Sequence, residues 1–126
     1  MRKQTWNFFA GLTIGMAGLV VGCKSEPPLP KVDCATVSPV PTYGQVTIFE
    51  VCNQCHSTTK TGSQRHDADG DINYNTFADA KKDAEGAARE VNGGDMPPSN
   101  PGIELRAITA DEKTALYEWA LCGTPE

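Results

Sequence analysis

Two cysteines and a histidine lie within five consecutive residues near the middle of the chain. Cys52 and Cys55 are separated by two residues, and His56 follows directly. Two thiols at this spacing lie on the same side of a tight helical turn, where each can add to one vinyl group of a single haem. The adjacent imidazole then reaches the iron of that haem. The segment therefore predicts one covalently attached haem c per chain, with His56 as an iron ligand.

A Cys-x-x-Cys pair also occurs in thioredoxin-like redox sites and in zinc sites. A thioredoxin-like site requires a strand before the pair and a βαβ pattern around it, and the sequence shows neither. A structural zinc site requires a second ligand pair at short spacing, whereas Cys34 and Cys122 are single and remote from the motif. The haem motif is therefore favoured over both.

An electron-transfer haem needs a second axial ligand, and two residues could supply it. Met96 lies in the sequence Gly-Gly-Asp-Met-Pro-Pro, where glycines let the backbone approach the macrocycle and prolines keep the following chain extended. His66 lies among charged residues, which is more typical of an exposed or propionate-bonding histidine. We therefore predict Met96 as the second ligand. Ligation by two histidines would lower the reduction potential.

Three segments carry helical signals. The first, 42–52, leads directly into the motif but contains β-branched residues. The second, 76–91, repeats alanines at steps of three and four residues between charged residues. The third begins at Thr109, which forms a Thr-x-x-Glu capping box with Glu112, and ends before Gly123. A long loop is predicted over 57–73.

The chain from about 43 to 122 resembles the class I monohaem cytochromes c. The similarity is carried by the Cys-x-x-Cys-His motif near the front and the Met-Pro-Pro loop before a terminal helix. It implies an all-α fold of about three main helices around the haem. It also implies His56 as the proximal ligand and Met96 as the distal one.

The family often crosses its terminal helices at a small residue and an aromatic residue, eight and four positions before the first haem cysteine. These positions hold Gly44 and Ile48 here, and Phe49 follows the latter. The resemblance implies Trp119 as the partner on the last helix. The loop after His56 lacks the family's frequent Gly-Pro pair.

The N-terminus has the pattern of an export signal. Arg2 and Lys3 precede an apolar run that is shorter than the ~20 residues of a membrane span. The run ends in Leu-Val-Val-Gly-Cys, which resembles the lipobox of bacterial lipoproteins. We expect residues 1–22 to be a signal peptide and Cys23 to be lipidated. A transmembrane anchor and ordinary cleavage are the alternatives.

Residues 23–41 are rich in proline and predict an extended tether before a domain over 42–126. Loss of the signal leaves 9 basic and 16 acidic residues, a net charge of 9 − 16 = −7. Nucleic acid is therefore an unsuitable partner, and a basic redox protein is a suitable one. Lys24 after the lipidated cysteine favours the outer membrane, on its periplasmic face.

Two cysteines remain after the lipid and the haem have used three. Because an exported protein meets oxidising conditions, we predict a disulfide between Cys34 and Cys122, with two free thiols as the alternative. The acidic segment 67–71 begins like a calcium-binding loop, but Ile72 and Ala78 replace the Gly and Glu that such a loop needs. A solvated turn is predicted there.

These features predict a membrane-anchored electron carrier that cycles between Fe(III) and Fe(II) and does no chemistry on a substrate. The alternative is a haem peroxidase or gas-binding sensor with an open sixth site, which requires that Met96 does not bind. A structural lipoprotein would remain only if no haem were attached.

Overall fold

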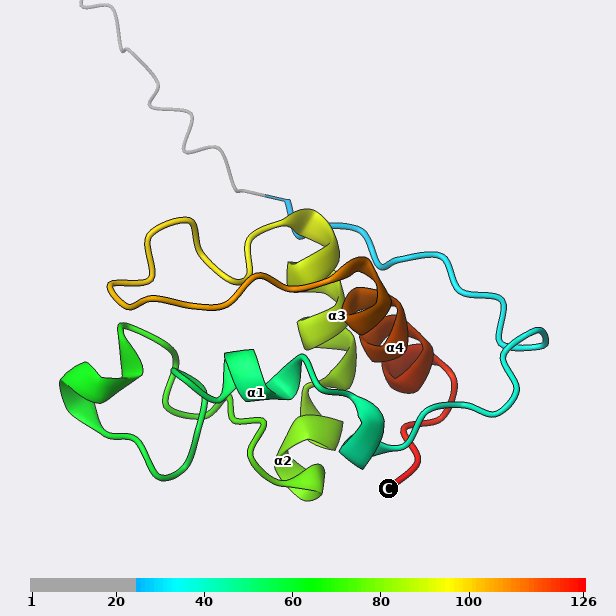
Figure 1. Cartoon of the computed structure of the whole chain (residues 1–126), viewed down its shortest axis with the longest axis horizontal. Coiled ribbons are helices and arrows are strands. Elements are labelled where there is room, and N and C mark those ends of the chain that lie inside the picture. Colours follow the sequence, from blue (N-terminus) through cyan, green and yellow to red (C-terminus); the bar gives the residue numbers. More distant parts are fainter. Residues whose placement is uncertain (1–24) are drawn as a thin grey trace, which may run out of the picture.

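A computed structural model describes residues 25–126, and residues 1–22 and Cys23 therefore lie outside the described part. Figure 1 shows short helices joined by long loops. In chain order the elements are η1 (Tyr43–Gln45), α1 (Phe49–Cys52), η2 (Gly62–Arg65), α2 (Phe77–Lys82), α3 (Ala84–Gly93) and α4 (Ala110–Leu121). Residues 25–126 contain no β-strand, so the predicted all-α class is confirmed at this level.

Helix α4 is formed as its sequence predicts. The Thr109 hydroxyl accepts a hydrogen bond from the Glu112 amide at 3.2 Å, and the Glu112 carboxylate accepts one from the Thr109 amide at 2.9 Å. The helix ends before Gly123, which has a φ of +114°. Reciprocal capping satisfies two amides that the first turn leaves unpaired, which fixes where the helix begins.

The other two predicted helices are interrupted. The segment 76–91 is divided into α2 and α3 at Asp83, whose φ of −120° and ψ of 25° are not helical. The Asp83 carboxylate accepts a hydrogen bond from the Tyr74 hydroxyl at 2.6 Å, a tertiary contact. The segment 42–52 is divided into η1 and α1, with β-branched residues at the break.

An aromatic cluster fills the core beside α4. The Phe49 ring lies 5.6 Å from Tyr43, 5.3 Å from Tyr74 and 5.4 Å from Trp119, measured between centroids. The contact between Phe49 and Trp119 that the family resemblance implies is therefore present. Gly44 does not provide a close crossing, because a Cβ there would meet only a Thr42 hydroxyl, at 4.0 Å.

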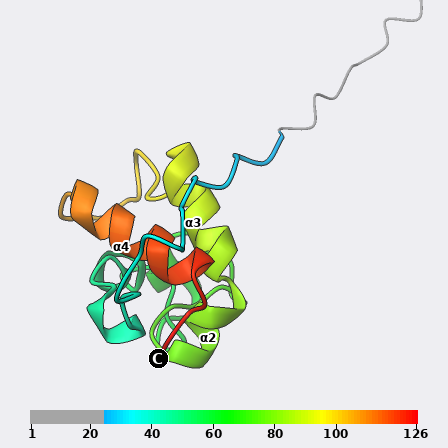
Figure 2. The same cartoon turned by 90° about the vertical axis from the view of Figure 1, so that its right-hand side faces the viewer.

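The described part of the proline-rich segment, 25–41, runs along the domain instead of extending away from it (Figures 1 and 2). Cys34 and Cys122 lie at disulfide distance, with their sulfurs 1.99 Å apart. A bond across so long a loop stabilises a fold by about 4 kcal/mol on the chain-entropy model. In the part of the chain that the structure describes, no helix has the length and apolar character needed to cross a membrane.

Candidate haem site

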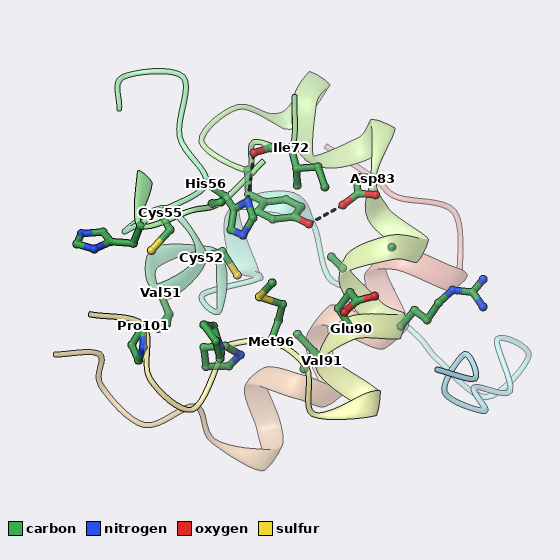
Figure 3. A pocket seen from close by; sticks show the side chains of 18 of the residues that line it. Val51, Cys52, Cys55, His56, Ile72, Asp83, Glu90, Val91, Met96 and Pro101 are labelled. Carbon is green, nitrogen blue, oxygen red and sulfur yellow. Dashed lines mark hydrogen bonds between the residues drawn. The ribbon is translucent and has the colours of Figure 1, made fainter. Parts of the chain in front are cut away.

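A cavity of about 560 Å³ opens between α1, α3, a first loop over 57–73 and a second loop over 95–108 (Figure 3). This volume is typical of a pocket for a small molecule or cofactor. The predicted haem residues Cys52, Cys55, His56 and Met96 all line it. The structure thus brings together side chains that are up to 44 residues apart in sequence, since 96 − 52 = 44.

The wall around these residues is largely apolar. The apolar side chains that line the cavity come from α1, the first loop, α3 and the second loop: Val51, Ala68, Ile72, Ala87, Val91, Pro97, Pro98, Pro101 and Ile108. Such a lining suits a flat apolar ring system.

Helix α1 and the turn after it deliver both thiols to the cavity. The amides of Cys55 and His56 donate to the Cys52 carbonyl at 3.1 Å and 2.8 Å, which continues the helical turn past the end of α1. Both cysteines are free thiols. Burial raises the pKa of Cys52 to about 12. A thioredoxin-like nucleophile requires a lowered thiol pKa, so this environment does not suit that alternative.

The His56 ring is oriented by a contact with the backbone of the loop that follows it. Its Nδ1 lies 3.3 Å from the Ile72 carbonyl oxygen. Because a carbonyl can only accept, Nδ1 carries the proton and the Nε2 lone pair is left for a metal. Burial lowers the pKa of His56, so the imidazole is neutral at neutral pH. A neutral imidazole is the form that coordinates iron.

Tyr74 packs against His56, a contact that no sequence signal indicated. Its amide donates to the His56 carbonyl at 3.0 Å, and its ring meets the imidazole edge to face at 5.4 Å. Burial, and then the hydrogen bond to Asp83, raise the pKa of the Tyr74 phenol. Tyr43 donates its hydroxyl to the Tyr74 carbonyl at 2.7 Å.

The first loop, 57–73, is organised around the buried side chain of Arg65, which sequence reasoning also missed. All five guanidinium N–H groups donate hydrogen bonds to acceptors on the same loop. The acceptors are the carbonyls of Ser57, Ala68, Asp69 and Ile72 and the side-chain oxygen of Asn73. The Ile72 carbonyl that orients His56 is therefore itself fixed by Arg65. An arginine between serines, threonines and glycines has no sequence signature of this role.

Met96 lies on the opposite wall and points into the cavity (Figure 3). Helix α3 ends at Gly93, and Gly94 after it has a φ of +78°. The amides of Asp95 and Met96 donate back to the Glu90 carbonyl at 3.0 Å and 3.2 Å. Met96 is 37% exposed. An exposed methionine beside a cavity is not core packing, which agrees with a ligand role.

His66, the alternative ligand, lies at the rim of the same cavity. It has a φ of +49°, in the left-handed region, and a Cβ added at Gly102 would lie 3.4 Å from its Nδ1. The side chain is half-buried against the second loop. The structure therefore brings both candidate ligands to the cavity.

A zinc site is not favoured by the arrangement. Across residues 25–126, no group of three or more His, Cys, Asp and Glu side chains is placed to hold a metal ion. Cys34 and Cys122, the only other cysteines in that range, are joined to each other. The two motif thiols consequently lack the further protein ligands that tetrahedral zinc needs.

The chain was compared with protein-family models, with curated proteins and with solved structures, and none of the three comparisons found a match.

Proposed function

We propose that this protein is an electron carrier with one haem c, attached through Cys52 and Cys55 and ligated by His56. The observation that carries the proposal is the shared cavity, into which two free thiols and an oriented neutral imidazole face together. The class I cytochrome c fold is part of the same proposal. The helices of residues 25–126, which contain no strand, support it, and so does the position of His56 and Met96 on opposite walls.

The residues of the cavity fit the cofactor. The wall is mostly apolar, as the macrocycle requires, and acidic or basic side chains lie at Glu26, Asp67, Asp83, Arg89 and Glu90. The thiols lie on one turn, as attachment to two vinyl groups of one ring requires. The haem iron would supply one-electron chemistry by cycling between Fe(III) and Fe(II).

The protein's part is to hold the ligands in place during that cycle. The Ile72 carbonyl and the Tyr74 ring fix the plane of the His56 imidazole, and Arg65 fixes Ile72. A histidine whose ring cannot rotate keeps the same geometry in both oxidation states. Little reorganisation is then needed when an electron arrives or leaves.

Met96 would be the sixth ligand. Its loop presents the thioether from the wall opposite His56, and a methionine ligand raises the reduction potential. If Met96 did not bind, the site would instead suit a haem peroxidase or a gas-binding sensor.

The carrier would work outside the cytoplasm, attached to a membrane by lipid at Cys23. The basic, apolar and Gly-Cys parts of residues 1–23 support this location. Several acyl chains give stable attachment without a membrane-spanning helix. Its donor and acceptor would be redox proteins, and the net charge of −7 (9 − 16) favours basic ones.

Expression together with a cytochrome c maturation system tests the proposal. We expect a haem that stays with the chain after denaturation, in a ratio of one to one. The ferric spectrum should contain the thioether-to-iron charge-transfer band at the red edge. High-spin ferric haem without that band would support the peroxidase or sensor, and a chain without haem would refute both.

A further inference from the structure

The first described residues of the mature chain are bound to α3, close to the cavity. We call residues 26–28 the strap. Arg89 Nη1 donates to the Pro27 carbonyl at 3.2 Å, and Asn92 Nδ2 donates to the Pro28 carbonyl at 3.0 Å. Glu26 pairs with Arg89 at 3.5 Å. Figures 1 and 2 both show this part of the chain beside α3.

Gly93 shows how closely the strap lies on the helix. A Cβ at this position would be 2.4 Å from the Pro27 Cβ, a distance at which one of the two must move. Gly93 is the last residue of α3, and the absence of a side chain there lets Pro27 lie directly on the helix.

The strap also lies at the rim of the cavity. Glu26, whose side chain is 79% exposed, is one of the residues that line it, together with Arg89 and Glu90. Cys23 is three residues before Glu26, and three residues span at most about 10 Å. With the strap bound, a lipid on Cys23 would therefore lie within about 10 Å of the rim. If the proline-rich segment 23–41 were not bound to the domain, the lipid could lie much further from it.

We infer that the strap holds the mouth of the haem cavity at the membrane surface, where it faces a redox partner confined to the same membrane. This inference rests on the proposed haem and lipid attachment. Four acidic side chains, Glu26, Asp67, Asp83 and Glu90, line the cavity with one arginine, Arg89. The partner that fits this surface has a basic docking face at the level of the lipid head groups.

Two variants distinguish a strap that is bound to α3 from a tether that is free. Gly93→Ala places a methyl group where Pro27 lies, so it should release the chain back to the disulfide at Cys34. A 12-residue Gly-Ser insertion between Lys24 and Ser25 should leave the strap bound but add about 20 Å of mean reach. Gly70→Ala is the matched control, since a Cβ there meets no atom within 4 Å.

The readout is energy transfer from the membrane to the haem. Lipidated holoprotein is bound to phosphatidylcholine vesicles that contain a little fluorescent head-group lipid, and the haem quenches fluorophores near it. We expect strong quenching for the unaltered protein and for Gly70→Ala. Quenching should fall by about half or more in Gly93→Ala and in the insertion variant, because both lengthen the reach of the chain. Equal quenching in all four proteins would overturn the inference.

A second measurement tests the functional consequence. A ferrocenium head-group lipid in the same vesicles accepts one electron from the ferrous haem, which becomes ferric, with no proton transferred. The insertion should slow this oxidation severalfold, whereas oxidation by soluble ferricyanide should not change. If both oxidants were unaffected by the insertion, confinement to the membrane would be refuted.

The underlying proposal is checked separately. Haem absorbance shows whether the cofactor is attached, and sedimentation with vesicles shows whether the lipid is present. Failure of either would contradict the proposed function. If both are present and quenching is unchanged in the variants, only the strap inference fails.

Discussion

The two loops on opposite walls of the cavity are built in different ways. The loop 57–73 is closed around Arg65, whose five N–H groups are all paired with acceptors of the loop itself. The loop 95–108 is held mainly at its ends. Its start is bonded to the Glu90 carbonyl, and near its end Arg106 pairs with Glu112 at 2.6 Å.

The loop 57–73 is therefore a preformed wall of the cavity, and the loop 95–108 is an adaptable one. The wall that carries His56 is fixed by polar contacts of the protein itself, because the Ile72 carbonyl that His56 meets is also held by Arg65. The wall that carries Met96 is more exposed and depends less on its own hydrogen bonds. We expect the first loop to determine stability and the second to determine the sixth ligand.

The largest expected effect on stability is that of Arg65→Ala. It removes all five hydrogen bonds that the buried guanidinium donates to the loop, which should lower the free energy of unfolding by about 3 kcal/mol or more. Denaturant unfolding of the holoprotein measures this. Asn100→Ala, in the second loop, should change stability by only about 0.5 kcal/mol or less. Equal losses of unfolding free energy in Arg65→Ala and Asn100→Ala would contradict the difference between the two walls.

Met96→Ala should leave the haem attached but change its ligation. With the thioether removed, the charge-transfer band should disappear, the ferric haem should become high-spin and the reduction potential should fall. Spectra and a redox titration measure these changes. His66→Ala is the control and should alter neither. If His66→Ala opened the sixth site instead, Met96 would not be the ligand.

Tyr74→Phe tests whether the hydrogen bond from Tyr74 to Asp83 stabilises the wall that carries His56. The change removes the 2.6 Å hydrogen bond to Asp83 and keeps the ring, so it should cost about 1–2 kcal/mol. Thermal unfolding gives the difference. Tyr117→Phe is the matched control, since its hydroxyl has no hydrogen-bond partner within residues 25–126. A similar loss in the two variants would show that the Asp83 bond does not stabilise the fold.

The smallest expected effect concerns Glu112, at the end of the second loop. The Arg106 guanidinium beside it, and then the Thr109 amide, lower the pKa of its carboxyl from 4.5 to about 2. A lowered folded-state pKa contributes stability above pH 4.5 that is lost as the pH falls toward 2. The difference in melting temperature between the unaltered protein and Glu112→Gln should therefore be full at pH 7 and shrink below pH 4.5. Glu104→Gln, which removes an exposed carboxylate of the same loop, is the control.

Local sequence signals predicted the elements that need no tertiary contact. The capping box of Thr109 and Glu112 marked the start of α4, and Gly123 marked its end, because these residues act within one turn. The predicted helices over 42–52 and 76–91 were wrong in their continuity. Asp83 lies between α2 and α3 and bonds Tyr74, a contact that no periodicity within 76–91 could indicate.

The sequence by itself determined the spacing of Cys52, Cys55 and His56 on which the proposed haem attachment rests, because thiols and imidazole on one turn are positioned by a short stretch of chain. It also indicated Met96, from the glycines and prolines around it. Only the tertiary structure decided how these groups are arranged around one cavity. The tautomer of His56 depends on the Ile72 carbonyl, which Arg65 holds. The strap depends on a proline meeting a glycine that is 66 residues further along the chain, since 93 − 27 = 66. Contacts between residues so far apart in the chain leave no pattern in the local sequence from which they could be predicted.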